Sequence, residues 1–486
     1  MNKLDKCKWL IGLVPFVAVS CNSGSKNSIT PEKPNVIFVL VDDMGFGDLS
    51  CYGQKAFSTP SIDRMASEGI RFDNFYTGST VSAPSRACLI TGKHTGHTSV
   101  RGNAPAQLMG DDELTIAKVM KAAGYKTGCI GKWGIGHPPP VDDPQRKGFD
   151  YFYGYINMWH AHNLYPEFLY RNGEKVFLDN KLQLKDGKNP WEESPEGTGV
   201  AEVKKEYVHN LFDKEALSFI EKNKNEKFFL LLAYNVPHAN NEKIPDGMEV
   251  PDYHEFAGKD WPSQERGFAA MMRNIDNSIN IIFSKLKELK IDEETMVIFC
   301  SDNGPHQEGG HIMEFFNSNG DWRGMKRDFY EGGVRTPFIV RWPGVIKPGI
   351  KSDHIAAFWD VLPTFSELTG NGQPAETDGI SFLPSLLGKE QSGKHDYLYW
   401  EFFEQGGKQA ILKDNWKAIR LNVRGDESKQ IFELYNLVSD PEEKVNVADK
   451  HPELKSEFDK LFISARKEFS VTPLFKIDQK TVETPF

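Results

Sequence analysis

The chain has 486 residues, of which 39% are hydrophobic, and its formal net charge is −10 at pH 7. This length exceeds one ordinary hydrophobic core, so we expect a large domain followed by a smaller one. The negative charge and the lack of any dense basic run argue against nucleic acid as a partner.

The N-terminus has the pattern of a secretion signal. Three lysines precede an apolar run at residues 9–19 that is too short to span a membrane, and Cys21 follows it. The segment resembles a bacterial lipoprotein signal, but Ala18 stands where that signal usually has Leu, so ordinary signal cleavage is the alternative. We expect residues 1–21 to be a signal peptide and residues 22–33 a flexible linker. The protein would cross the inner membrane and stay in the periplasm, anchored by lipid on Cys21.

Three continuous apolar runs predict strands that are buried on both faces, at residues 35–41, 228–233 and 296–300. Each of the last two runs follows an amphipathic helical pattern. Before the third run, apolar side chains recur every three or four residues from Met272 to Leu289. Residues 114–123 form a further predicted helix. Strands alternating with helices predict an α/β three-layer sandwich with a large, mostly parallel central sheet.

The pattern changes from about residue 390, where short aromatic-rich runs are separated by glycines and charged turns. These runs lie at residues 397–403, 410–412, 416–421 and 431–437. They predict a small antiparallel sheet, and residues 452–469 predict a helix after it. We therefore expect a main domain at residues 34–389 and a C-terminal sheet-and-helix subdomain at residues 390–486.

The segment Ser82-Ala83-Pro84-Ser85-Arg86 places a small nucleophile, a proline and a fixed cation within one helical turn. Proline is favoured at the first helical position, so we expect Pro84 to open a helix with Ser82 just ahead of it. Arg86 can then fold back toward the Ser82 side chain. Taken alone, the segment favours the alternative interpretation of an ordinary serine helix cap beside a solvated arginine.

Polar pairs follow two of the predicted strands. Asp42-Asp43 comes directly after the first strand, and Asp302-Asn303 comes directly after the third. The carboxyl ends of parallel strands form the ligand crevice of such a sheet, so we expect these side chains to meet there. Oxygen ligands favour Ca²⁺ or Mg²⁺ over zinc or copper. The alternative is that each pair only caps the helix that follows.

Three further cations are predicted to reach the same crevice. Lys132 and His238 follow predicted strands, and Lys326 lies in a glycine-rich stretch. A lone lysine or histidine in a loop is more often solvated than catalytic. Together with Arg86 and a metal, however, these residues would form a site for a tetrahedral anion.

These blocks, with Leu89-Ile90-Thr91-Gly92 after Arg86, resemble in order and spacing the sulfatase family of the alkaline phosphatase superfamily. The resemblance implies that a serine-type sulfatase-maturing enzyme oxidises Ser82 to formylglycine. It implies one Ca²⁺ ion, with the ligands Asp42, Asp43, Asp302, Asn303 and the modified Ser82. Arg86 and Lys132 would hold the formylglycine, whereas Lys326 and His238 would contact the sulfate, with His238 as the acid for the leaving alcohol.

One position departs from the family pattern. The family usually has Gly-Lys-Trp-His, and this chain has Gly134 in place of the histidine. His137, three residues later, is a candidate for the missing imidazole, and it is equally a candidate for the substrate pocket.

A sulfated glycan is the expected substrate, with galactose or N-acetylgalactosamine sulfate as the sugar. Export with an anchor suggests it, and the Gly-Pro-His306 sequence resembles bacterial carbohydrate sulfatases. Several aromatic and polar residues are candidates for the pocket of the leaving group, although loop packing explains each of them equally well. They are Arg101, Trp159, His160, His162, His306 and Glu308.

Two other functions are the alternatives. A phosphate or phosphonate ester hydrolase of the same superfamily would share the sheet, but such phosphatases usually hold two zinc ions through several histidines. A glycan-binding protein without catalysis would become credible if Ser82 stayed unmodified. The sequence leaves the oligomeric state open.

Overall fold

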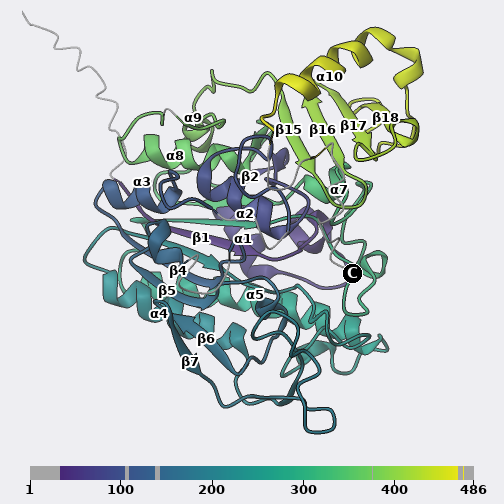
Figure 1. Cartoon of the computed structure of the whole chain (residues 1–486). Helices are drawn as coiled ribbons and strands as arrows, with labels where there is room; N and C mark the ends of the chain where they lie inside the picture. Colours follow the sequence, from purple (N-terminus) through teal and green to yellow (C-terminus); the bar gives the residue numbers. More distant parts are fainter. Residues whose placement is uncertain (1–32, 104–108, 137–142, 375, 469–473, 475–486) are drawn as a thin grey trace, which may run out of the picture. The chain divides into compact units, whose positions relative to one another are not determined.

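The computed structural model describes residues 33–103, 109–136, 143–374, 376–468 and 474 (Figure 1). The predicted signal peptide, the lipidation site Cys21 and the candidate His137 lie outside these residues. Among the residues described, no helix is both long and apolar enough to cross a membrane.

A ten-stranded mixed sheet forms the centre of the protein (Figure 1). In spatial order its strands are β13 (Ile350–Ser352), β2 (Ile70–Phe72), β12 (Phe338–Arg341), β11 (Thr295–Ser301), β1 (Asn35–Val41), β10 (Phe228–Ala233), β4 (Lys126–Lys132), β5 (Tyr151–Tyr155), β6 (Phe168–Arg171) and β7 (Glu174–Phe177). The five strands from β11 to β5 are all parallel, and antiparallel pairs lie on both flanks. The prediction of a large, mostly parallel sheet is confirmed.

Helices cover both faces of this sheet, because successive residues of a buried strand point to opposite sides. In β1, Ile37 and Val39 belong to one hydrophobic cluster, and Phe38 and Leu40 belong to the other. The first cluster contains side chains of α1 (Pro60–Glu68), α4 (Val208–Asn223) and α5 (Ser263–Glu288). The second contains side chains of α2 (Ser82–Thr91), α3 (Ile116–Ala122), α8 (Val361–Leu368) and α9 (Leu383–Leu386). The three-layer arrangement is therefore as predicted.

The C-terminal region forms a separate four-stranded antiparallel sheet and a helix (Figure 1). Its elements are β15 (Leu398–Phe402), β16 (Lys408–Lys413), β17 (Trp416–Leu421), β18 (Ile431–Asn436) and α10 (Pro452–Ser464). One face of this sheet packs on Phe458 and Phe462 of α10. The other face contacts the main part of the molecule, where the Trp400 ring lies 5.7 Å from that of Trp359. The predicted sheet and helix are confirmed.

The remaining elements are short. They are β3 (Phe75–Tyr76), β14 (Ala356–Ala357), β8 (Lys181–Leu182), β9 (Ala201–Val203), α6 (Met313–Phe316) and α7 (Glu331–Val334), and the 3-10 helices η1 (Phe46–Asp48), η2 (Ser50–Tyr52), η3 (Pro144–Lys147), η4 (His160–His162), η5 (His254–Phe256), η6 (Phe358–Asp360), η7 (Glu427–Lys429) and η8 (Ala448–Lys450).

The predicted start of the helix at Pro84 was wrong by two residues. Helix α2 begins at Ser82 with Val81 as its N-cap, so Ser82 occupies the first helical position and Pro84 the third. Proline is tolerated there because the N–H groups of the first helical turn have no partner within the helix. The nucleophile candidate is thus held inside the first turn of the helix.

Candidate active site

The ends of β1 and β11 bring the two polar pairs together. These parallel strands are paired up to Val41 and Ser301, so the residues that follow them lie side by side. The Asp43 N–H donates to Oδ1 of Asp302 at 3.1 Å. Asp42, Asp43, Asp302 and Asn303 are all fully buried. These side chains therefore lie close together at one edge of the sheet, as predicted.

The donor set of this cluster fits a hard cation. Carboxylate oxygens of Asp42, Asp43 and Asp302 lie within 4.8 Å of one another. Asn303 donates its Nδ2 to Oδ1 of Asp43 at 2.7 Å, and its buried Oδ1 has no hydrogen-bond donor among the described residues. Burial and the neighbouring Asp42 raise the pKa of Asp302 to about 7. A divalent cation would satisfy the amide oxygen and relieve the repulsion between the carboxylates.

Ser82 lies against this cluster. Its Oγ donates to Oδ1 of Asp42 at 2.8 Å. Three residues later on α2, the Ser85 hydroxyl donates to the backbone oxygen of Asp302 and accepts from the Gly78 N–H. The first turn of α2 is therefore fastened to the end of β11, and this contact fixes the distance between Ser82 and the acidic cluster.

Two buried cations complete the inner part of the site. Arg86 donates Nε to Oδ2 of Asp302 at 2.8 Å and Nη1 to the backbone oxygen of Lys132 at 2.7 Å. The Lys132 Nζ donates to Oδ2 of Asp42 at 2.7 Å and lies 3.3 Å from the Ser82 Oγ. Burial raises the pKa of Asp42, but the cations Lys132 and Arg86 outweigh burial and hold that pKa well below its ordinary value.

Gly134 lies directly beside these cations. Its φ is +68°, a left-handed conformation that L side chains rarely adopt. A Cβ atom at this position would lie 2.9 Å from Cε of Lys132 and 3.1 Å from its Cγ. The aliphatic part of the Lys132 side chain thus occupies the space where a side chain at position 134 would begin. Glycine in place of the family's histidine lets Lys132 pack there.

Lys326 and His238 form the outer part of the site with Glu308. The Lys326 Nζ donates to Oδ2 of Asp43 at 2.8 Å, to Oε2 of Glu308 at 2.8 Å and to Nε2 of His238 at 3.1 Å. The Nδ1–H of His238 donates to the backbone oxygen of Ala239 at 2.7 Å, so its Nε2 offers a lone pair to Lys326.

The charges in this outer part are strongly coupled. Burial and Lys326 lower the pKa of His238 to about 3. Burial raises the pKa of Glu308, but the cations Lys326 and Arg327 hold it well below its ordinary value. The site therefore presents a cationic Lys326, a neutral His238 and an anionic Glu308 within hydrogen-bonding reach of one another.

The other pocket candidates are divided between the site and the interior. The rings of His162 and His306 both stack on that of His238, with ring centroids 4.8 Å and 5.9 Å away. His160 is instead fully buried, and its ring contacts those of Tyr155 and Phe168. Burial lowers the pKa of His160 to about 3. Trp159 is 8% exposed.

Arg101 has partners of a different kind. Its Nη1 donates to Oε1 of Glu401 in β15 at 2.9 Å and to the backbone oxygen of Lys467 at 2.8 Å. The described contacts of Arg101 thus join the segment after α2 to the C-terminal sheet, and a contact with substrate stays a prediction.

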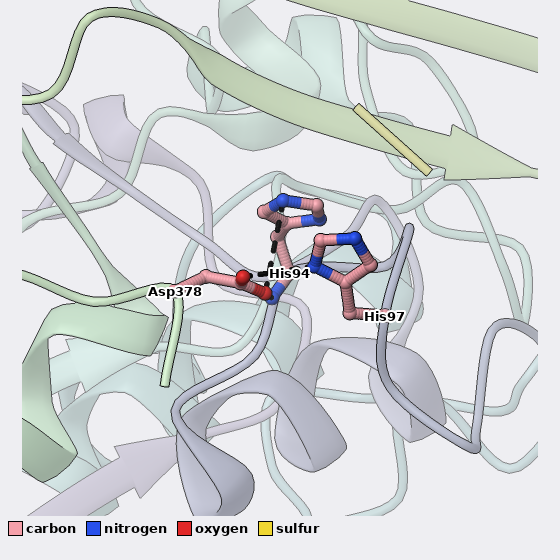
Figure 2. A group of neighbouring side chains, drawn as sticks. All are labelled: His94, His97 and Asp378. Atoms are coloured by element: carbon pink, nitrogen blue, oxygen red, sulfur yellow. Dashed lines mark hydrogen bonds and ion pairs between the residues drawn. The ribbon is translucent and has the colours of Figure 1, made fainter. Parts of the chain in front are cut away.

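A second cluster of potential metal ligands was missed by the sequence reasoning, although the His94-x-x-His97 spacing was visible. Figure 2 shows the Asp378 carboxylate facing both histidines from one side, with its oxygens 2.8 Å from His97 Nδ1 and 3.7 Å from His94 Nε2. The Gly96 N–H donates to Nδ1 of His94 at 3.1 Å, so in the neutral ring Nε2 carries the proton and offers no lone pair to a metal.

This second cluster instead fastens the end of α2. The His94 N–H donates to Oδ2 of Asp378, and the Asp378 N–H donates to the backbone oxygen of Gly92, which is the C-cap of the helix. The helix that carries Ser82 and Arg86 is therefore tied to its surroundings at both ends.

Comparison with known proteins agrees with this geometry. A family model described as Sulfatase matches residues 34–371, and one described as N-sulphoglucosamine sulphohydrolase, C-terminal, matches residues 320–467. The chain is 32% identical to an N-acetylgalactosamine-6-O-sulfatase of Bacteroides thetaiotaomicron, over 94% of this chain and 98% of that protein. It is 33% identical to the N-acetylgalactosamine-6-sulfatase of Homo sapiens, over 75% of this chain and 68% of that protein.

Solved structures have the same fold. A Bacteroides thetaiotaomicron protein from work on the metabolism of multiple glycosaminoglycans has a TM-score of 0.72 and 28% identity, over 90% of this chain and 99% of that chain. Ps i-CgsB in complex with k-i-k-neocarrahexaose has a TM-score of 0.72 and 25% identity, over 90% and 94% of the two chains. With the acidic cluster, Ser82 and the surrounding cations in one place, the chain belongs to the sulfatase family and is a sulfuric ester hydrolase.

Proposed function

We propose that this protein removes the 6-sulfate from N-acetylgalactosamine 6-sulfate in a glycan. The named relatives support the substrate, since an N-acetylgalactosamine-6-O-sulfatase is 32% identical over 94% of the chain. The position of Ser82 is the main structural observation that supports sulfate ester hydrolysis. Its Oγ lies 2.8 Å from a carboxylate oxygen of Asp42 and 3.3 Å from the Lys132 Nζ, at the first turn of α2.

We infer that a serine-type sulfatase-maturing enzyme removes two hydrogens from Ser82 and leaves formylglycine. The hydrate of this aldehyde would supply two hydroxyls. One would bond to the sulfur as the sulfur–oxygen bond to the sugar breaks. The other would then lose its proton, so that the aldehyde forms again as the carbon–oxygen bond to the sulfate breaks. Plain serine could form the sulfate ester but could not release it in this way, because it has no second hydroxyl.

The proposed resident metal is one Ca²⁺ ion. Asp42, Asp43, Asp302 and Asn303 would hold it, together with an oxygen of modified Ser82. Such oxygen-only sets suit a hard cation, and the unpartnered Asn303 Oδ1 supports this choice. When bound, the ion supplies positive charge close to the nucleophile and the sulfate oxygens.

The inner cations of the chain stabilise the nucleophile. Lys132 and Arg86 are 2% exposed, so little water screens their charge. A hydroxyl beside both of them loses its proton more readily than one in water. The same two cations would face the negative charge that builds on the sulfate oxygens during the transfer.

The outer pair handles the leaving group. Lys326 and His238 would bind the sulfate oxygens that face away from Ser82. The leaving alcohol needs one proton. We assign the Lys326 ammonium as its source and His238 as the relay, because the Lys326 Nζ donates to Nε2 of His238 at 3.1 Å; Nε2 would take this proton and pass it to the alcohol, leaving Lys326 neutral. This pair would also cover part of the role of the histidine that is absent at Gly134.

The place of action is a further proposal. A signal peptide at residues 1–21 and lipid on Cys21 would hold the enzyme at the periplasmic face of a membrane. This rests on the sequence pattern of the N-terminus.

The deciding measurements are two. The peptide that carries residue 82, taken from protein made in its native host, should be two hydrogens lighter than serine predicts. That protein should release sulfate from N-acetylgalactosamine 6-sulfate faster than from other sulfated monosaccharides. An unmodified Ser82 at full occupancy would contradict the mechanism, and a preference for another sugar would contradict the substrate.

A further inference from the structure

Two carboxylates flank the Lys326 and His238 pair, which is unexpected beside a site for an anion. Glu308 reaches both residues, with its Oε2 2.8 Å from the Lys326 Nζ and 3.3 Å from Nε2 of His238. Glu242 contacts the imidazole that stacks on His238, since its Oε1 is 3.2 Å from Nδ1 of His162. Asn241 joins the two, because its Nδ2 donates to Oε2 of Glu308 at 3.2 Å. We call Asn241, Glu242 and Glu308 the acceptor rim.

The acceptor rim is more open than the residues that it surrounds. The side chains of Glu308 and Glu242 are 15% and 10% exposed, whereas those of Lys326, His238 and Asp43 are 6%, 4% and 0% exposed. The rim therefore lies on the outer side of the cations, where the part of the substrate beyond the sulfate would lie.

Several oxygen atoms of the acceptor rim lack donors. Oδ1 of Asn241 and Oε2 of Glu242 are buried and have no hydrogen-bond partner among the described residues. Oε1 of Glu308 accepts from Nη1 of Arg327 at 2.8 Å, and a carboxylate oxygen can accept a second hydrogen bond. Buried acceptors without donors are unfavourable, so a ligand that brings donors would be favoured here.

The acceptor rim is held in place by the backbone around it. The Glu308 N–H donates to Nδ1 of His306 at 3.0 Å, and Nε2–H of His306 donates to the backbone oxygen of Pro237 at 3.0 Å. The loop after β11 is thus tied to the loop after β10. A fixed set of acceptors discriminates between ligands better than a mobile one.

We propose that the acceptor rim selects a sugar with free hydroxyls next to the sulfate ester and rejects one with a second sulfate there. Hydroxyl and amide N–H groups of an N-acetylhexosamine can donate to the rim oxygens. A second sulfate brings only acceptors and negative charge, and two carboxylates would repel it. A site that hydrogen-bonds a substrate hydroxyl discriminates strongly against an analogue without it. This inference rests on the proposed function.

The test compares two substrates on full-length enzyme that carries formylglycine at position 82. N-acetylgalactosamine 6-sulfate and N-acetylgalactosamine 4,6-disulfate are supplied separately, and kcat/KM is measured for release of the 6-sulfate. We expect the wild type to prefer the monosulfate by about a hundredfold, which corresponds to the loss of one or two hydrogen bonds to charged acceptors.

The main variant is E242Q, because Glu242 has no described contact with Lys326 or Asp43. It keeps the size of the side chain, removes the charge and adds N–H donors. We expect the preference for the monosulfate to fall about tenfold. E308Q should shift the preference in the same direction, and it also lowers both rates through its contact with Lys326. E314Q, an exposed change on α6, is the control and should leave the preference unchanged.

The outcomes separate the two proposals. An equal turnover of both substrates by the wild type, or an unchanged preference in folded E242Q and E308Q, would overturn the acceptor rim while leaving the proposed function intact. Release of sulfate from neither sugar, by protein with confirmed formylglycine, would overturn the proposed substrate and the inference with it. Thermal unfolding of each variant shows whether it is folded, so a misfolded E242Q is replaced by E308Q.

Discussion

The Ser82 Oγ donates to Oδ1 of Asp42 at 2.8 Å, although 40 residues separate the two in the chain. This contact joins the first turn of α2 to the end of β1, so one helix and one strand together set the position of Ser82. Two further contacts fix the helix side, since the Ser85 hydroxyl donates to the backbone oxygen of Asp302 and Arg86 donates to its carboxylate.

Replacement of Ser82 should abolish turnover and leave the fold intact. Alanine at this position removes the hydroxyl and hence the aldehyde, and it fits the first turn of a helix. S82A should unfold within a few degrees of the wild type and release no sulfate. In a host that converts cysteine but not serine to formylglycine, S82C should be active and the wild type inactive. Sulfate release by S82A would contradict the assignment of Ser82 as nucleophile.

Substitution of Gly134 should reduce both stability and activity. A side chain at φ +68° costs about 1 to 2 kcal/mol of folding free energy, and a Cβ here would also displace Lys132. We expect G134A to lower Tm and to lower kcat/KM at least about tenfold, because Lys132 contacts Ser82 and Asp42.

Gly344 supplies the control for this change. Its φ is +76°, and no atom lies within 4 Å of a Cβ built there. G344A should therefore lower Tm by a similar amount and leave kcat/KM unchanged. Equal kinetics for G134A and the wild type would show that the contact with Lys132 is not important for catalysis.

Metal removal should destabilise the protein. Three buried carboxylates lie close together next to Asn303, whose amide oxygen has no donor among the described residues. A cation that binds only the folded state adds its binding energy to stability. At a concentration of 100 times Kd, Ca²⁺ should contribute about 2.7 kcal/mol, measured as the difference in unfolding between calcium and a chelator. N303A should show a smaller difference, and an equal response in both proteins would place the ion elsewhere.

The stability of the protein should fall between about pH 4 and pH 7 through Asp48. Burial raises the pKa of this carboxyl from 3.8 to about 7, although the nearby Ser318 and the Gly45 N–H, which donates to its Oδ2 at 2.8 Å, lower it. Between these two pKa values the folded state holds a proton that the unfolded state has already released. The contribution of Asp48 to the free energy of unfolding is therefore lost as pH rises. The loss reaches a few kcal/mol and is complete above pH 7.

The change D48N tests this dependence. Its amide N–H groups replace the acid proton at every pH, so the Tm of D48N relative to wild type should rise from pH 5 to pH 8. D260N, at an exposed position, should show no such trend. A constant difference between D48N and the wild type across this range would mean that Asp48 is ionised in the folded protein.

Much of the fold followed from local patterns. The strands at residues 35–41 and 228–233 were predicted with their observed bounds, because a strand buried on both faces is a continuous apolar run. The start of α2 was predicted two residues late, since proline is acceptable at several positions of a first turn and only the packing of Ser85 on Asp302 selects one.

The sequence by itself determined which residues meet at the ends of β1 and β11, because parallel strands place their carboxyl ends at one edge of a sheet. It also indicated the nucleophile segment, since a small residue, a proline and an arginine were within one turn. It could not determine what surrounds them. The filling of the space at Gly134 by Lys132, the place of Arg101 at Glu401, and the rim around Lys326 depend on contacts between distant segments. Those contacts arise from packing in three dimensions, which no local periodicity encodes.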